Sequence, residues 1–252
     1  MGIKLDDIKE LFEFIKLNLG DHFTELSIIE LGEEEFKIFN DEKKSNFLIE
    51  YLKSDPRLYN KNLIKNDTSI GLYAKDYLKK RFKEVISINY NNKCPKTLKK
   101  RLHDDINLNK KYDILINFGH TKDIGLNYDA NDNIIYKSFK NIHDMIKKGG
   151  LIFNILPSYC KKNTVIVGSV NYSLEFFDEL AKLCGYRIFY NNIKLRSSDG
   201  NNIIYNIHSH YVKNNNNNFI SENEFMKLRK HIKLTNKVGQ NFRQYFKNYK
   251  IK

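Results

Sequence analysis

The stretch Tyr112-Asp-Ile-Leu-Ile-Asn-Phe-Gly119 does most to decide how this chain folds. It is a short, nearly continuous apolar run that ends in glycine, which is typical of a strand buried on both faces of a sheet. Similar apolar runs occur at residues 26–32, 84–89 and 151–156. Segments with helical spacing alternate with these runs, and this alternation predicts a mostly parallel α/β sheet.

Five segments place apolar residues at helical spacing and are predicted helices: 5–19, 72–82, 134–148, 173–184 and a last one that opens with the capping box Ser221-Glu-Asn-Glu224. Glycine follows three of them and is expected to end them, at Gly20, Gly149 and Gly185. The runs 186–193 and 203–212 have no helix between them. They predict an antiparallel hairpin at one edge of the sheet.

The composition indicates a folded protein. Of 252 residues, 41% are hydrophobic, which is enough for a substantial core and excludes the disordered and fibrous classes for most of the chain. Its three cysteines, at positions 94, 160 and 184, have neither the pattern of a disulfide framework nor the paired spacing of a zinc site. No apolar run reaches the roughly 18 residues of a membrane span, and the early acids are unlike a signal peptide. We therefore expect a cytoplasmic protein that does not enter a membrane.

The net charge of +13 is partly concentrated at the C-terminal end, where nine basic residues and no acidic ones follow Glu224. Five asparagines at 214–218 form a spacer, so we divide the chain into a domain of residues 1–213 and a basic helical extension of residues 214–252. Four aromatic residues of the extension recur at helical spacing: Phe242, Tyr245, Phe246 and Tyr249. This stripe favours docking onto the domain over binding of RNA or DNA by the Lys and Arg side chains.

Taken together, several segments resemble a family of small S-adenosylmethionine-dependent methyltransferases with a Rossmann-like fold. The likeness is carried by residues 28–32, 73–77 with 85–89, 112–119, 139–144 with 149–157, and 172–177 before Gly185 and Tyr186. It implies an α/β fold with a mostly parallel seven-stranded sheet that ends in a C-terminal antiparallel hairpin. It also implies S-adenosylmethionine as the cofactor.

The resemblance assigns cofactor contacts to the ends of the first two long strands. Glu30 is expected to orient the ammonium end of the cofactor, directly or through water, and Gly32 to let it approach the backbone. In the family an acid usually closes the second strand and binds both ribose hydroxyls, whereas this chain has Asn89. An amide still accepts one hydrogen bond, but the charge-assisted contact is lost.

Further cofactor contacts are assigned after the second strand and at the end of the next long one. Asp105 matches the position that meets the adenine amino group in the family. Asn117, Phe118 and Gly119 end the strand that begins at Tyr112, at the edge where an open α/β sheet binds its ligand. The glycine-rich loop of the wider superfamily is absent, since acids follow Gly32 at positions 33–35.

His120 and Asp123 are the candidate catalytic residues. His120 directly follows Gly119, at the expected lip of the pocket, and Asp123 lies three residues later. A hydroxyl acceptor benefits from a general base, so His120 is our first choice and Asp123 our second. The alternative for His120 is a loop cap or a solvent contact.

Three other histidines are interpreted as structural. His143 lies on a predicted amphipathic helix and is expected to pack or cap internally. His208 and His210 alternate on a predicted edge strand and so share a face, but no third ligand is evident. We expect surface histidines there and no metal site. Tyr172 either lines the acceptor pocket or, as we favour, packs in the core.

Two functions from different classes follow. The first is a methyltransferase that acts on a small-molecule acceptor, with a sugar or glycan-precursor hydroxyl favoured by analogy with the family. The second is a catalytically degenerate, methyltransferase-like protein that binds nucleic acid or a partner enzyme. The missing acid at Asn89 keeps this second hypothesis open, and the sequence sets no oligomeric state.

Overall fold

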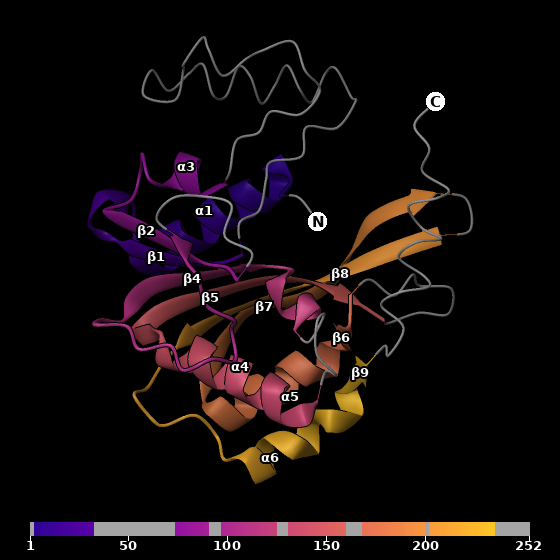
Figure 1. The fold of residues 1–252 in the computed structure, drawn as a ribbon. Helices are drawn as coiled ribbons and strands as arrows, with labels where there is room; N and C mark the ends of the chain where they lie inside the picture. Colours follow the sequence, from indigo (N-terminus) through magenta and orange to yellow (C-terminus); the bar gives the residue numbers. More distant parts are fainter. Residues whose placement is uncertain are drawn as a thin grey trace.

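The computed structural model describes residues 3–32, 74–90, 97–124, 131–159, 168–199 and 202–234. Within these ranges one nine-stranded sheet forms the middle of the molecule, and helices cover both of its faces (Figure 1). None of the helices in these ranges is long and apolar enough to cross a lipid bilayer.

Five neighbouring strands pair in parallel, in the spatial order β3 (Thr97–Leu98), β2 (Glu84–Ile88), β1 (Ser27–Leu31), β4 (Tyr112–Phe118) and β5 (Ile146–Ser158). β1 lies between β2 and β4, and Leu31 is in register with both Ile88 and Asn117. The carboxyl ends of these three strands therefore meet at one edge.

The sheet continues past β5 with the predicted hairpin. β8 (Asn202–Lys213) pairs antiparallel with β5, and β7 (Tyr186–Asp199) pairs antiparallel with β8 at the edge. The order β3-β2-β1-β4-β5-β8-β7 with β8 reversed is that of the Rossmann-like methyltransferase fold, which confirms the predicted fold class. Two short strands, β6 (Val170–Tyr172) and β9 (Ile232–Leu234), pair with each other beside the end of β5 and raise the number of strands from the expected seven to nine.

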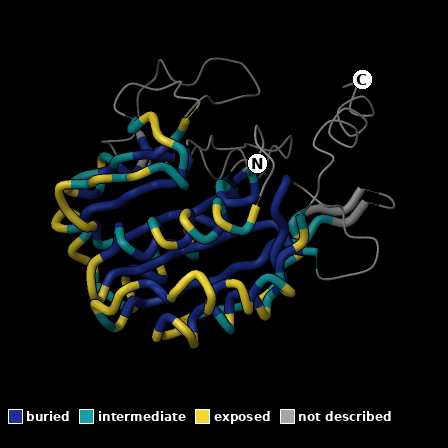
Figure 2. The backbone as a smooth tube through the Cα atoms, turned by 60° about the horizontal axis from the view of Figure 1, so that its bottom comes forward, coloured by how far each residue is buried: buried dark blue, intermediate teal, exposed yellow. Residues whose placement is uncertain are grey.

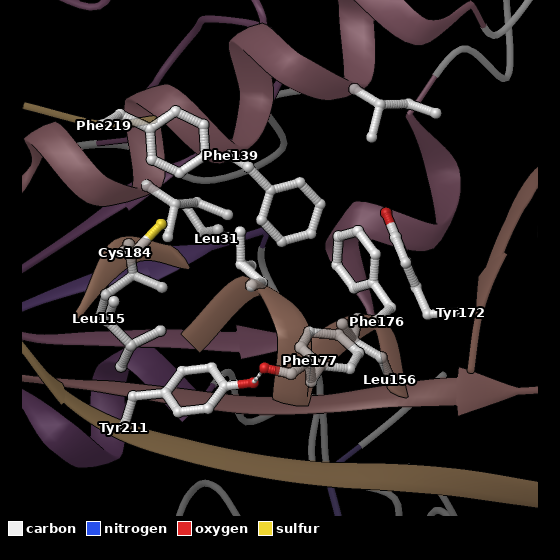
Figure 3. Packing of buried hydrophobic residues seen from close by; sticks show 14 of the residues in the cluster. Leu31, Leu115, Phe139, Leu156, Tyr172, Phe176, Phe177, Cys184, Tyr211 and Phe219 are labelled. Atoms are coloured by element: carbon white, nitrogen blue, oxygen red, sulfur yellow. Dashed lines mark hydrogen bonds between the residues drawn. The ribbon is translucent and has the colours of Figure 1, made fainter. Parts of the chain in front are cut away.

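One face of the sheet is covered by α4 (Asp132–Asp144), α5 (Leu174–Cys184), α6 (Glu222–Met226) and the 3-10 helix η4 (Lys227–His231). Figure 3 shows the cluster between these helices and the strands, where Phe139, Phe176 and Phe177 face Leu31, Leu115 and Leu156. Tyr211 of β8 belongs to it, and its hydroxyl donates to the carbonyl oxygen of Phe177 at 2.9 Å. Tyr172 also belongs to this cluster and is fully buried, in agreement with the favoured interpretation that it packs in the core.

The other face is covered by α1 (Leu5–Leu19) and α3 (Ala74–Leu78). Ile8, Leu11 and Ile15 of α1 are buried in a second cluster with Ile28 and Ile114 of the sheet. Figure 2 shows the resulting pattern, with buried strands in the middle and exposed residues on the outer sides of the helices. The predicted packing of the first helix on a larger body is confirmed.

The predicted end of α4 is wrong. The helix stops at Asp144 rather than at 148, and residues 147–150 form a bulge in β5 opposite Asp113. A Cβ atom at Gly150 would lie 2.9 Å from the Asp113 carbonyl oxygen, so the glycine here permits close strand contact instead of ending a helix. The strand also continues beyond the predicted stop at Pro157, where β4 no longer lies beside it.

The C-terminal region of the described chain only partly follows the prediction. Ser221 and Glu224 form the expected capping box of α6. The helix is short, however, and Ile232 lies in β9, paired with Tyr172, instead of on a continuing helix. The predicted aromatic stripe of the extension lies outside the described residues.

The prediction for His143 is confirmed, whereas the one for His208 and His210 is wrong. His143 is buried, as expected, and its two ring nitrogens contact the Tyr186 hydroxyl at 2.6 Å and the Asn217 carbonyl oxygen at 2.7 Å. The expectation that His208 and His210 are surface residues is wrong: they are 5% and 1% exposed. Both lie under α1, because the strand that carries them is inside the sheet and not at its edge.

Replacing the fully buried Phe176 with alanine is expected to lower the free energy of unfolding by about 3–5 kcal/mol, because its ring packs against Phe139, Tyr172, Phe177 and Phe225. Urea unfolding followed by circular dichroism measures the change. Leu183→Ala, at an exposed position of the same helix, is the control and should change stability by less than about 0.5 kcal/mol. Equal effects of the two substitutions would contradict this packing.

Candidate functional site

The candidate site lies where β1, β2 and β4 end together. Gly32 follows β1, and its N–H donates to the carbonyl oxygen of Ile88 at 2.8 Å. Asn89 follows β2, and its N–H donates to the carbonyl oxygen of Leu98 at 3.1 Å. The backbone thus brings two of the predicted cofactor residues, Gly32 and Asn89, to neighbouring strand ends.

Glu30 lies within β1, one residue before the strand ends, and its side chain is fully buried. The hydroxyl of Ser87, the residue opposite it on β2, donates to a Glu30 carboxylate oxygen at 2.9 Å. A buried carboxylate is costly unless hydrogen bonds or a cation compensate for the lost water. The Ser87 hydroxyl therefore offsets part of the cost of burying the Glu30 carboxylate. Ser87 was not predicted from the sequence. Its place opposite Glu30 in parallel strands is the signal that could have identified it.

Gly32 has a φ of +87°, and a Cβ atom there would lie 3.0 Å from Nδ1 of His120. A residue with a side chain would therefore be strained in its backbone and would crowd the imidazole. The sequence predicted that this glycine lets the cofactor approach the backbone. In the structure, the His120 ring lies in that space.

His120 reaches this position because Gly119 turns the chain after β4. Gly119 has left-handed backbone angles and begins the 3-10 helix η3 (His120–Asp123). Burial lowers the pKa of His120 to about 4, with the Asp123 charge opposing the shift and the Lys122 charge adding to it. The imidazole is thus uncharged near pH 7 and offers a free nitrogen lone pair, but its low pKa makes it a weaker general base than a histidine that titrates near pH 7.

Asp123, the second candidate base, is engaged by a neighbour. Its carboxylate forms an ion pair with the ammonium of Lys122, whose side chain is almost completely buried. This arrangement makes Asp123 better suited to balancing a local charge than to taking a proton from a substrate.

Asn117 holds the end of β4 in place through its side chain. Its amide nitrogen donates to Oγ1 of Thr121 at 3.1 Å and to Oδ1 of Asn154 at 3.0 Å. Asn154 is the register partner of Asn117 on β5, and all three residues are buried. Thr121 and Asn154 were not predicted from the sequence. The signal that could have identified Asn154 is that each of the two apolar strands contains one asparagine, Asn117 and Asn154, at the same level of the sheet.

The remaining predicted contacts are Phe118, the last residue of β4, and Asp105. The Phe118 ring is buried on the α1 side of the sheet and packs edge-on against Phe153, with ring centroids 5.7 Å apart. Asp105 is exposed, in the segment between β3 and β4. Asn141 of α4 fixes the backbone just before it by donating to the carbonyl oxygens of Leu102 and Asp104.

A buried lysine lies beside the same strand ends. Lys75 of α3 is 1% exposed, and its ammonium donates to Oγ1 of Thr97 at 2.7 Å. Thr97 is in register with Ser87, the partner of Glu30. Buried positive and negative groups thus lie on neighbouring elements at this edge, which suits a ligand that carries both charges.

Comparison with solved structures finds methyltransferases. They include the N-methyltransferase NodS from Bradyrhizobium japonicum in complex with S-adenosyl-L-homocysteine, which is 8% identical with a TM-score of 0.40 over 82% of this chain and 87% of that one. An S-adenosylmethionine-dependent methyltransferase from Clostridium acetobutylicum is 10% identical, with a TM-score of 0.34 over 91% and 80% of the two chains. The sugar N-methyltransferase KedS8 from Streptoalloteichus is 6% identical, with a TM-score of 0.34 over 89% and 76%.

At these identities and TM-scores the likeness says nothing about the function of this chain. No protein-family model matches the sequence, and no curated protein does. The strand order and the residues at the strand ends are therefore the features that bear on function.

The depressed pKa of His120 predicts a pH dependence of stability. The unfolded chain takes up a proton at this residue below about pH 6.5, whereas the folded chain does so only near pH 4. The His120 contribution to stability is therefore complete above about pH 6.5 and is lost as the pH falls toward 4. Urea unfolding at several pH values should show a shallower loss for His120→Gln than for the wild type. His22→Gln, at an exposed position, should keep the wild-type slope. Equal slopes for all three proteins would contradict the lowered pKa of His120.

Proposed function

We propose that this protein is a cytoplasmic S-adenosylmethionine-dependent methyltransferase that acts on a small-molecule acceptor. The observation that carries the proposal is the strand order β3-β2-β1-β4-β5-β8-β7, in which β8 runs opposite to its neighbours. The ends of β1 and β2 in this sheet carry the buried acid Glu30, Gly32 and the amide Asn89. An open α/β sheet of this kind binds its ligand at the carboxyl ends of its strands.

The donor set at this edge fits the proposed cofactor. The ammonium of its amino-acid end is a suitable partner for the buried carboxylate of Glu30, either directly or through water. Asn89 offers one acceptor to the ribose hydroxyls, and Asp105 is the proposed partner of the adenine amino group. The buried ammonium of Lys75 is the proposed partner of the carboxylate end.

When bound, the cofactor supplies an electrophilic methyl group on a sulfonium, whose leaving thioether is neutral. The work of the protein is then to align donor and acceptor and to exclude water. For a hydroxyl acceptor, His120 takes the proton, since its imidazole is uncharged near pH 7. We favour a sugar or glycan-precursor hydroxyl as the acceptor, by analogy with the resembled family.

The position of His120 also supports a second candidate function. Its ring lies against Gly32, in the space where the family resemblance expects the cofactor, and Asn89 replaces the ribose-binding acid. A chain in which this space stays closed is a non-catalytic scaffold that binds a partner enzyme or nucleic acid. Binding of the cofactor distinguishes the two functions.

Isothermal titration calorimetry with S-adenosylmethionine and S-adenosylhomocysteine tests the first function, which predicts micromolar dissociation constants. Asn89→Asp should tighten binding about fivefold, because a charged acceptor adds about 1 kcal/mol to a hydrogen bond. Asn109→Asp adds the same charge at an exposed position near the opposite edge of the sheet and should leave the affinity unchanged.

The outcomes separate the two functions. An affinity that Asn89→Asp leaves unaltered would contradict the ribose assignment. Absence of binding to either compound, together with retention of RNA that weakens steeply with salt, would favour the scaffold function.

The role of His120 is tested by methyl transfer from labelled S-adenosylmethionine to a panel of sugars. His120→Gln should lower kcat by about 10²–10⁴-fold, as expected for loss of a general base, while the dissociation constant for S-adenosylhomocysteine changes far less. Asp123→Asn should have a smaller effect on kcat, because its carboxylate is paired with Lys122. A larger effect of Asp123→Asn than of His120→Gln would reverse the assignment.

A further inference from the structure

A second cluster of chemically competent side chains lies between α1 and β8, away from the candidate cofactor site. His208 and His210 are two residues apart on β8 and so point to the same face of the sheet. That face is covered by α1, which contributes Glu10. One potential ligand atom from each residue lies within 4.8 Å of the other two.

The contacts within this cluster are close. Nδ1 of His208 lies 3.0 Å from Oε2 of Glu10, and Nε2 of His210 lies 2.8 Å from Oε1. Both histidines are buried, and Glu10 is only partly exposed. Two imidazole nitrogens and a carboxylate therefore already converge on one small volume.

The cluster is separate from the candidate cofactor site. Glu30 of β1 is in register with Ile116 of β4, Ile116 with Phe153 of β5, and Phe153 with His210. His210 thus lies three strands away from Glu30 at the same level of the sheet. At about 4.8 Å between neighbouring strands, the two backbone positions are roughly 14 Å apart.

The packing around His210 holds its ring in one orientation. The ring stacks on Phe153, with centroids 3.9 Å apart and planes inclined by 12°, and it also contacts Phe14 and Tyr190. A ligand whose orientation is fixed before binding loses little entropy when it binds.

A cation already interacts with this cluster. The ammonium of Lys194 on β7 lies 2.8 Å from Oε2 of Glu10. Its side chain is 42% exposed, so it can withdraw into solvent and leave both carboxylate oxygens to another cation. Lys194 is therefore a specific competitor for the Glu10 carboxylate.

We propose that Glu10, His208 and His210 form a binding site for zinc, with Lys194 as the cation that zinc displaces. Zinc takes imidazole nitrogen and carboxylate oxygen ligands at about 2.0–2.2 Å, and three protein ligands leave a fourth position for water. A histidine pair on one strand with an acid from a facing helix supplies this set. The third ligand that the sequence did not reveal is Glu10, 198 residues before His208.

The surroundings also set the expected strength of binding. Nδ1 of His210 is buried and has no hydrogen-bond partner within the described ranges, whereas a zinc-bound histidine is usually oriented by such a partner. Lack of that partner costs about 10–100-fold in affinity. We therefore expect micromolar rather than nanomolar binding.

Calorimetry of the full chain, freed of metal with a chelator, with zinc chloride alone tests the proposal. One zinc should bind per chain, and cobalt(II) should give the visible absorption of a tetrahedral site. Glu10→Gln and His210→Gln should each weaken zinc binding more than about 100-fold, since loss of a ligand exceeds loss of its orienting partner. Lys194→Met should tighten it about tenfold or more, because the competing ammonium is removed.

A matched control is available on the opposite face of the sheet. His231 contacts Glu179 at 3.0 Å in the same kind of histidine–carboxylate pair, and neither belongs to the three-ligand cluster. His231→Gln should leave zinc binding unchanged. Because Lys194→Met retains all three ligands, it tests the site even where a ligand variant fails to fold. Failure of the wild type to bind zinc, or affinity that Lys194→Met does not raise, would overturn the proposal.

Discussion

Pairing of polar side chains between neighbouring strands is the constraint on which the rest of this structure depends. Glu30 with Ser87, and Asn117 with Asn154, are buried within the parallel sheet and face partners at the same level. Each would cost about 1–3 kcal/mol if its partner were lost. A shift of one residue in strand register would place these groups opposite apolar side chains. The register that satisfies Glu30 and Ser87 also brings the ends of β1 and β2 together.

Local patterns in the sequence were sufficient for most of the fold. The strand at residues 112–118 is observed as predicted, and α5 ends at Gly185 as expected, because both depend on neighbouring residues alone. The end of α4 was misread because Gly149 and Gly150 serve a bulge against β4, which is a contact between strands. His208 and His210 were placed on the surface because the helix that buries them lies almost 200 residues away in the sequence.

The sequence likewise predicted only part of the candidate site. The positions of Glu30, Gly32 and Asn89 at neighbouring strand ends follow from parallel pairing, which the alternation of strands and helices predicted. The contact of His120 with Gly32 could not be predicted, since it depends on how η3 folds back over another strand. The acids at positions 33–35 lie outside the described residues. The proposed zinc site lies under α1, and the proposed cofactor site lies at the carboxyl ends of β1, β2 and β4.

The central claim is that the strand ends at Gly32, Asn89 and Gly119 receive S-adenosylmethionine. A crystal structure of the protein grown with its product, S-adenosylhomocysteine, tests this most directly. The account predicts the ribose beside Asn89, the amino-acid end near Glu30, and the His120 imidazole facing the sulfur. A structure grown at saturating ligand in which the His120 ring still fills the space against Gly32, with no ligand at the strand ends, would contradict it.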